Sequence, residues 1–431
     1  MGSVVSSSSK TVNVQREVAL PEANGVPSPE IVCGKDERVQ VDPMTSPPYK
    51  WVCFLSTYYS KKGLTYVASG FKIYLPDVGR TAIVTSGHVT YSKDDGGYPD
   101  RITVKFPGQT AIIVRDQKNM YAAPEFISSS DADYDYGLIL LPGAGTSDDG
   151  FGWSAVVPDE ELNNRLVTNC GYPNDKPSGT MWITGGKITS ATKTRIMYMN
   201  DTFNGESGSP VYTWYGGYWT VVGVHHGATP GKPPVCPNIA TRFTIPMIYR
   251  FLEFMKEKKQ NSLKSAAFPD VYIRCDGSGV SPGKPAGGGT VNCQYTPPGP
   301  WEKFYICPVE VPPSLAPDEP HKVVIESTVF PNVFIRLDSN GFNGPSSSTG
   351  GGVVDSQYNA GPWEIYYLQK LKASSSVAFR SVQFPHLYIR LDGGRVHSHS
   401  PTGGGTVNCQ WYIDPYSTPP AVGSYESFCI A

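Results

Sequence analysis

The sequence is poor in charged residues and has no long hydrophobic run. Asp, Glu, Lys and Arg make up 17 % of the 431 residues, and the formal net charge at pH 7 is −2. A chain this close to neutral lacks the basic footprint that nucleic-acid binding requires, so we expect no nucleic-acid partner. No apolar stretch approaches the roughly 18 residues of a membrane span, which excludes a transmembrane helix.

Cysteine patterns typical of zinc sites or disulfide frameworks are also missing. The nine cysteines are an odd number and include no CxxC pair and no Cys/His spacing suited to zinc. We interpret them as free thiols that pack as small hydrophobic side chains. Cys275 supports this interpretation, because Leu337 and Leu391 stand at the equivalent position of two related segments. We therefore predict no metal and no organic cofactor.

No secretory signal is readable at the start of the chain, because residues 1–10 are polar and rich in serine. Gly2 lies in the string MGSVVS, which fits the N-myristoylation pattern. Residues 1–30 show little periodicity, and we expect them to form a flexible leader. These features favour the cytoplasm but leave the compartment open.

Turn-forming residues, in contrast, are abundant. The sequence has 45 glycines, 39 prolines and 26 tyrosines. Many turn residues together with many β-forming residues indicate short strands joined by tight turns. The length suits two domains better than one. We therefore predict an all-β fold in two parts.

Three copies of one pattern occupy the last part of the chain. They begin with FPDVYIRCD at residues 268–276, FPNVFIRLD at 330–338 and FPHLYIRLD at 384–392. Copies this short cannot bury a hydrophobic face alone, so they must share one core. The threefold repetition resembles the β-trefoil fold of ricin-type lectins and fascin-like modules. The resemblance implies a β-trefoil domain at residues 266–431.

The repeated residues allow two interpretations. In the first, they are strand, core and turn positions that recur because threefold symmetry requires them. In the second, Asp276, Asp338 and Asp392, with neighbouring aromatic and amide side chains, bind a sugar. The ricin-type Gln-x-Trp motif is not present in regular form, so a carbohydrate and a protein ligand are both open.

Residues 245–260 carry the clearest helical pattern. Ile248, Phe251, Leu252 and Met255 fall at i, i+3, i+4 and i+7, and lysines close the end. The polar run that follows, up to residue 265, marks the expected domain boundary. Before the helix we expect many short strands, for example at residues 81–85 and 137–141.

Three short strings carry the chemistry. NGESGSPV at residues 204–211 has glycines that let the backbone turn sharply and present Ser207. A nucleophilic serine needs a base and a carboxylate that orients the base. His88 follows a strand-like run, and Asp135 directly precedes the run GLIL. Asp133 is the alternative acid, but it does not directly precede that run.

The order His, Asp, Ser and these motifs resemble the chymotrypsin-fold serine proteases. The string GESGSPV is closest to the GNSGSPV of the V8-like glutamyl endopeptidases. TGGKIT at residues 184–189 and DERVQV at 36–41 are similar to two further strings of that branch. The resemblance covers roughly residues 31–255. It implies a double β-barrel protease domain with a C-terminal helix at residues 31–260.

The resemblance also implies catalytic roles. Ser207 corresponds to the nucleophile, His88 to the general base and then acid, and Asp135 to the carboxylate that fixes the tautomer of His88. The backbone N–H groups of Gly205 and Ser207 correspond to the oxyanion hole. Glu206 departs from the usual Asp or Asn, and whether it takes part in an ion pair with a new N-terminus stays open.

Substrate preference is implied by the string VGVHHG at residues 222–227. His225 aligns with the histidine that contacts the substrate glutamate in the V8-like branch, and Thr202 matches a second contact. A histidine supplies a hydrogen-bond donor to a carboxylate, although a buried core histidine is the alternative for His225. His226 stands where the branch has tryptophan, and we expect it at the surface or on the wall of the site.

The sequence therefore predicts a serine endopeptidase that acts on peptide bonds after acidic residues, with an attached ligand-binding module. Two alternatives are a catalytically silent protease-like scaffold and a lectin-like defence or toxin protein. Glu30 precedes an apolar residue where similar mature chains begin. We therefore also expect autocatalytic cleavage after Glu30.

Overall fold

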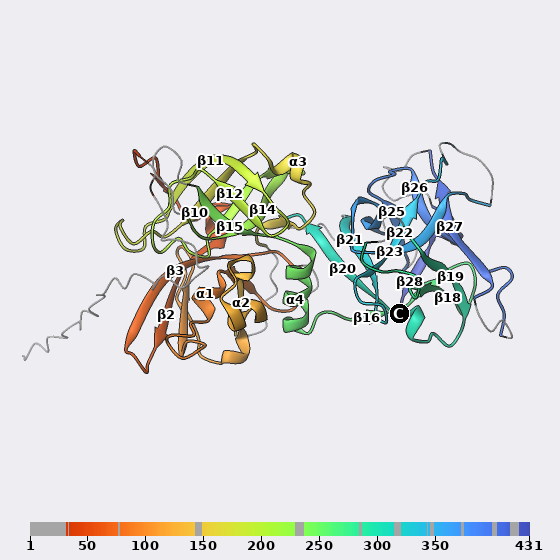
Figure 1. The fold of residues 1–431 in the computed structure, drawn as a ribbon, viewed down its shortest axis with the longest axis horizontal. Helices are drawn as coiled ribbons and strands as arrows, with labels where there is room; N and C mark the ends of the chain where they lie inside the picture. Colours follow the sequence, from red (N-terminus) through yellow and green to blue (C-terminus); the bar gives the residue numbers. More distant parts are fainter. Residues whose placement is uncertain are drawn as a thin grey trace, which may run out of the picture.

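The computed structural model describes twelve stretches of the chain: residues 32, 34–75, 78–142, 149–228, 237–283, 287–313, 320–342, 344, 349–371, 375–398, 403–413 and 422–431. Two bodies lie side by side, with residues up to 255 in one and the three repeats in the other (Figure 1). The expectations about Gly2, the leader and cleavage after Glu30 lie outside the described residues. Among the described residues, no helix is both long and apolar enough to cross a membrane.

The first body contains a seven-stranded antiparallel sheet in the order β6-β5-β2-β3-β4-β8-β7. Its strands are β2 (Val52–Tyr59), β3 (Leu64–Lys72), β4 (Ala82–Thr85), β5 (Arg101–Lys105), β6 (Ile112–Val114), β7 (Met120–Ala122) and β8 (Gly137–Leu140). Two short helices, α1 (Gly87–Thr90) and α2 (Pro124–Ser129), follow β4 and β7. Apolar side chains of the sheet enclose a core of their own, which includes Cys53, Leu55, Ile83, Val104 and Ile139.

A second group of strands completes this body. They are β1 (Val39–Gln40), β9 (Gly152–Ser154), β10 (Leu166–Gly171), β11 (Trp182–Ala191), β12 (Arg195–Tyr198), β13 (Pro210–Tyr215), β14 (Tyr218–Ala228) and β15 (Asn238–Arg242); helix α3 (Asp159–Leu162) precedes β10. These strands enclose a separate apolar cluster that includes Val167, Ile188, Ile196, Val211 and Val222. The prediction of an all-β fold is confirmed, and two cores are what a pair of barrels requires.

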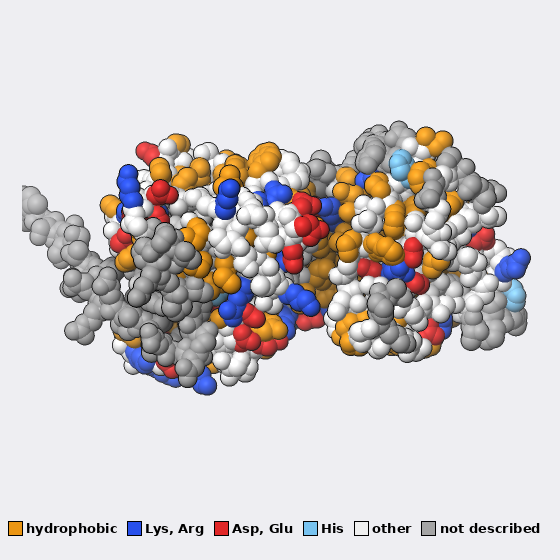
Figure 2. All heavy atoms as spheres, turned by 45° about the horizontal axis from the view of Figure 1, so that its top comes forward, with side chains coloured by type: hydrophobic (Ala, Val, Ile, Leu, Met, Phe, Trp, Pro, Cys, Tyr) orange, Lys and Arg blue, Asp and Glu red, His pale blue; other side chains and the backbone are white. Residues whose placement is uncertain are grey.

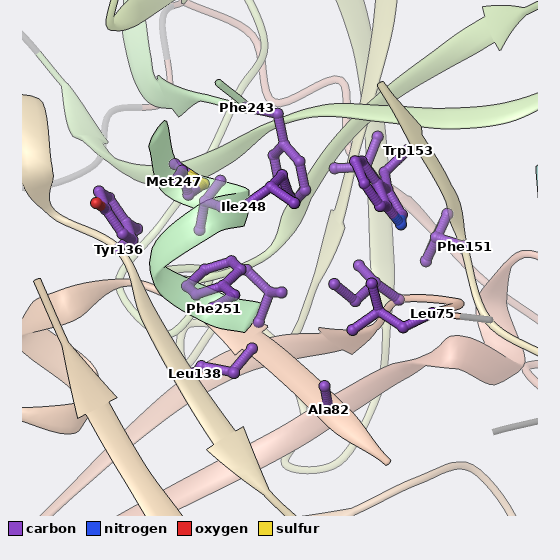
Figure 3. Packing of buried hydrophobic residues seen from close by; sticks show 14 of the residues in the cluster. Leu75, Ala82, Tyr136, Leu138, Phe151, Trp153, Phe243, Met247, Ile248 and Phe251 are labelled. Atoms are coloured by element: carbon purple, nitrogen blue, oxygen red, sulfur yellow. The ribbon is translucent and has the colours of Figure 1, made fainter. Parts of the chain in front are cut away.

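Helix α4 (Ile245–Met255) is the predicted amphipathic helix, but it ends at Met255 rather than at residue 260. Thr244 caps its start by accepting a hydrogen bond from the N–H of Met247. Lys256 then adopts a left-handed conformation with φ 63°, and the N–H of Glu257 turns back to the carbonyl of Leu252. The apolar face of α4 packs against the core that joins the two sheets (Figure 3).

The second body is built from three hairpins with the same register. Strands β18 (Val271–Asp276), β22 (Val333–Asp338) and β26 (Leu387–Asp392) pair with β19 (Gly289–Tyr295), β23 (Val353–Tyr358) and β27 (Gly405–Trp411). The other strands are β16 (Gln260–Asn261), β17 (Leu263–Ser265), β20 (Phe304–Val311), β21 (His321–Ser327), β24 (Tyr366–Lys370), β25 (Val377–Ser381) and β28 (Phe428–Ile430). Strand β19 contacts both β23 and β27, so the three hairpins meet one another.

One apolar core serves all three repeats, as the repetition predicts. Cys275, Leu337 and Leu391 are all fully buried in it at equivalent positions. Of the nine cysteines, the seven that the structure describes form no disulfide. The shared core and the common register support the β-trefoil interpretation, which stays a prediction.

The two bodies share a sheet and a core. Strand β9 pairs on one side with β14 and on the other with β20 from the second body. The Oγ of Ser154 donates to a carboxylate oxygen of Glu310 over 2.8 Å at this junction. Nearby, the ammonium of Lys258 lies over the rings of Tyr249 and Tyr305. On the face seen in Figure 2, acidic and basic side chains are interspersed rather than gathered in a patch of one sign.

Candidate active site

His88 and Asp135 lie at the same edge of the first sheet. Strands β4 and β8 are antiparallel neighbours, with Thr85 opposite Gly137, so the residues just after β4 meet those just before β8. The Nδ1 of His88 lies 2.8 Å from one carboxylate oxygen of Asp135. The backbone N–H of His88 donates to the other oxygen over 2.9 Å. Both carboxylate oxygens are therefore directed at His88, which fixes the orientation of the pair.

Asp135 is the acid that reaches His88, whereas Asp133 forms an ion pair with Arg195. The Asp135 carboxylate is almost fully buried, while the imidazole of His88 is partly exposed. Burial alone would raise the pKa of Asp135, but charge interaction and hydrogen bonding with His88 outweigh it and lower the pKa. Asp135 is thus an anion that stays charged beside a solvent-accessible imidazole.

Ser207 lies in a tight turn between two glycines with positive φ. Gly205 has φ 103° and Gly208 has φ 85°, a region that side chains disfavour. A Cβ on Gly208 would overlap the hydroxyl of Thr85 and the carbonyl of Ser69. The turn after Ser207 is therefore pressed against the end of β4, directly before the segment that carries His88.

One carbonyl joins the histidine segment to the serine turn. The carbonyl oxygen of His225 accepts a hydrogen bond from the hydroxyl of Ser86 over 2.7 Å and another from the N–H of Gly208 over 2.7 Å. Ser86 precedes His88 by two residues, and Gly208 follows Ser207. The carbonyl therefore holds the two segments at a fixed separation, although they come from different sheets.

The two N–H groups that flank the N–H of Ser207 are hydrogen-bonded within the protein. Those of Glu206 and Gly208 donate to the carbonyls of Phe203 and His225 inside the protein. The N–H groups of Gly205 and Ser207, predicted to bind the oxyanion, alternate with these. Ser69 holds both sides of the turn, because its hydroxyl donates to the carbonyl of Gly205 and its N–H donates to the carbonyl of Ser207.

The two residues predicted to set substrate preference are both buried, and their hydrogen-bond partners lie on neighbouring strands. His225 is fully buried on β14, and its Nδ1 lies 2.6 Å from the hydroxyl of Tyr198. The hydroxyl of Thr202, also fully buried, donates to the side-chain oxygen of Asn238 over 2.7 Å. Asn238 and Tyr198 are opposite each other on β15 and β12. Tyr198 and Asn238 are partners that the sequence did not reveal.

His226 is not at the surface. Its side chain is fully buried, and its Nδ1 lies 3.7 Å from the same oxygen of Asp135 that faces His88. Burial lowers the pKa of His226 to about 4, so the imidazole is neutral near pH 7. A bulge between His225 and Gly227 turns the side chain of His226 inward, which strand alternation alone does not predict.

The repeated aspartates have structural contacts. Asp276, Asp338 and Asp392 each accept a hydrogen bond from the backbone N–H two residues later. Each also lies within 4 Å of the arginine two residues earlier. These contacts support the structural interpretation of the repeats. Within the described residues, no three His, Cys, Asp or Glu side chains gather in a way that could hold a metal ion.

Comparison with curated proteins finds relatives of the first body. The chain is 33 % identical over 195 residues to a Bacillus subtilis (strain 168) protein named extracellular metalloprotease. It is 30 % identical over 185 residues to a glutamyl endopeptidase of Bacillus licheniformis and 27 % identical over 235 residues to one of Staphylococcus aureus. These matches cover 43 %, 42 % and 53 % of the chain, and 59 %, 54 % and 64 % of the relatives.

The chain thus spans little more than half the length of the first two relatives. Among solved structures, a Glu endopeptidase in complex with MPD matches 52 % of the chain and 98 % of its own length, at 22 % identity and a TM-score of 0.41. The protease Anisep from Arthrobacter nicotinovorans matches 51 % of the chain and 99 % of its own, at 13 % identity and a TM-score of 0.40. No protein-family model matches the chain.

Proposed function

We propose that this chain is a serine endopeptidase in which Ser207 attacks the peptide carbonyl, His88 transfers the proton and Asp135 orients His88. The observation that carries the proposal is the double contact of Asp135 with His88, at 2.8 and 2.9 Å. A buried carboxylate on Nδ1 leaves Nε2 of His88 as the atom that accepts a proton from the serine. Similarity to the glutamyl endopeptidases over about half the chain supports the same assignment.

In this mechanism the acyl-enzyme forms through a tetrahedral intermediate whose oxyanion binds the N–H groups of Gly205 and Ser207. His88 then passes its proton to the leaving amine and later activates the water that releases the acid. Ser69 supports the step, because its contacts fix the carbonyls of Gly205 and Ser207, the residues on either side of Glu206. The protease domain would comprise residues 31–260 and the β-trefoil domain residues 266–431.

We further propose a preference for glutamate, or an acidic residue, at the P1 position. If Tyr198 donates to Nδ1 of His225, the proton of the neutral imidazole is on Nε2, which can donate to a carboxylate. Thr202 is the second predicted contact, and its hydrogen bond with Asn238 fixes its position. The ligand of the C-terminal domain, a carbohydrate or a protein, stays a prediction.

A panel of peptides with Glu, Asp, Gln, Lys or Phe at P1 tests the proposal. We expect the highest kcat/KM with Glu, and a loss of kcat on the order of 10⁵–10⁶-fold in the Ser207→Ala variant. A folded wild-type chain that cleaves no peptide would refute the protease assignment. A preference for Lys or Phe would keep the protease and refute the role of His225. The Ser207→Ala chain on a glycan array tests for a sugar ligand.

A further inference from the structure

A buried arginine lies behind the turn that carries Ser207. The side chain of Arg38 is 1 % exposed, and its Nη1 lies 3.8 Å from a carboxylate oxygen of Glu206, whose side chain is completely buried. The same oxygen of Glu206 accepts the N–H of Phe203 over 2.8 Å. Arg38 is therefore a cation next to the one charged residue inside the predicted oxyanion turn.

Arg38 belongs to a short segment, residues 36–41, that is held on both sides of the arginine. The N–H of Glu37 donates to the carboxylate of Asp201 over 2.8 Å. Val39 and Gln40 form β1 and pair with β11, and the N–H of Val41 donates to the carbonyl of Met181. Contacts on both sides of Arg38, with Asp201 and with β11, thus fix the depth at which its guanidinium enters the protein.

Arg38 is one of two cations that face three carboxylates. Its guanidinium donates to both carboxylate oxygens of Asp36 and both of Asp175, and it faces Glu206 as a third anion. Lys176 reaches Asp36 over 2.7 Å and is the other cation in this group. Burial alone would lower the pKa of Arg38, but its carboxylate partners outweigh burial and raise the pKa above its usual value. Without Arg38, the buried carboxylate of Glu206 would lose this cation, and removing one partner of a buried ion pair is costly.

We propose that Arg38 is a positioning residue for the oxyanion hole, acting through Glu206. The N–H of Ser207 belongs to the peptide group that follows Glu206, and Gly205 directly precedes Glu206. A shift of the Glu206 backbone therefore turns the N–H of Ser207 and moves it relative to the N–H of Gly205. Oxyanion donors act on the transition state rather than on the bound substrate, so the effect falls on kcat and much less on KM. This inference rests on the proposed function and adds a residue that neither the motifs nor the comparisons assign.

The variants Arg38→Met and Arg38→Lys test the proposal, with Arg336→Met as a matched control. Arg336 is also a buried arginine facing two aspartates and a glutamate, but it lies in the second body. We expect Arg38→Met to lower kcat by about 10²–10³-fold, the scale of one lost oxyanion donor, with KM changed less than threefold. Arg38→Lys should recover at least tenfold of this loss, and Arg336→Met should leave kcat within threefold.

A double variant separates positioning from general stability. If Arg38 serves to neutralise Glu206, then Arg38→Met combined with Glu206→Gln should have a higher kcat than Arg38→Met alone. Thermal unfolding of each variant gives the folded fraction. An unchanged kcat in Arg38→Met, or a loss no larger than the loss of folded protein, would overturn the proposal, as would an effect on KM alone.

Hydrogen exchange distinguishes this proposal from the proposed function. Amides of residues 203–209 should exchange faster in Arg38→Met than in wild type, and at the wild-type rate in Arg336→Met. A wild-type chain without hydrolytic activity would refute the protease assignment, and the exchange result would still decide whether Arg38 holds the turn. Unchanged exchange at residues 203–209 would refute the positioning role.

Discussion

Arg38 and Arg336 have similar surroundings in two different parts of the molecule. Each arginine side chain is at least 94 % buried, and each faces two aspartates and one glutamate. Arg336 has two counterparts, Arg274 and Arg390, each beside a buried glutamate and an aromatic ring. Arg38 is not part of a repeat, and within the described residues its group of charges occurs once. Its glutamate, Glu206, is next to the proposed nucleophile.

The difference teaches how to interpret buried polar groups in this chain. In the repeats, the arginine, glutamate and ring occur three times because the same turn is built three times. In each copy the arginine contacts the glutamate and the ring of its own repeat. In the first body, the polar groups occur once and converge on one turn from separate elements. Repetition therefore indicates a structural role, and convergence of unrelated segments indicates chemistry.

The largest expected effect compares Asp135 with Asp338, two aspartates that each contact a basic side chain. Asp135→Asn should lower kcat by about 10⁴-fold, because an amide no longer fixes the required tautomer of His88. Asp338→Asn should leave kcat within twofold, because its partners belong to a repeat turn. Steady-state kinetics on a Glu peptide decides this. Equal losses in both variants would break the comparison.

The pH dependence of stability should have opposite signs in the two bodies. Burial raises the pKa of Glu364 from 4.5 to about 7, because Arg336, 4.0 Å away, makes its closer contacts with Asp338 and Asp355. The folded state therefore loses stability as pH rises from about 4.5 to about 7. The magnitude is on the order of 3 kcal/mol. Glu364→Gln should remove this loss.

The pKa shift of His226 has the opposite effect on the pH dependence of stability. Its pKa is lowered from 6.5 to about 4, so the unfolded state binds the proton first and the folded state loses stability as pH falls through that window. This loss is also on the order of 3 kcal/mol, and His226→Gln should reduce it. Urea unfolding of the full chain at pH 4.5, 6 and 8 measures both effects. If Glu364→Gln and His226→Gln changed the pH dependence of stability in the same direction, the opposite signs assigned to Glu364 and His226 would be contradicted.

The smallest expected effect concerns the shared core of the repeats. Cys275→Leu places in the first copy the residue that Leu337 and Leu391 already supply in the others. The free energy of unfolding should change by less than about 1.5 kcal/mol, because the core already accepts both side chains at this position. Urea unfolding measures the change. A loss above about 3 kcal/mol would show that the repeats are less equivalent than their contacts indicate.

Much of the fold followed from local patterns. Strands β4 and β8 lie where short runs of β-forming residues predicted them, and the three hairpins follow the three copies of one string. The end of α4 did not follow, because Lys256 leaves the helix through a left-handed conformation that nothing in its polar neighbourhood requires. The pairing of strand β9 could not be predicted either, because its partners β14 and β20 come from two different bodies.

The sequence by itself determined which residues are proposed to carry the chemistry, since His88, Asp135 and Ser207 stand in short strings whose glycines and strand patterns are local properties. It also determined the threefold repeat. Only the tertiary structure decided which charges face one another: Arg38 with Glu206, His226 with Asp135, and Tyr198 with His225. The reason is physical. A turn or a strand depends on neighbours in the chain, whereas burial and charge pairing depend on segments that only the folded protein brings together.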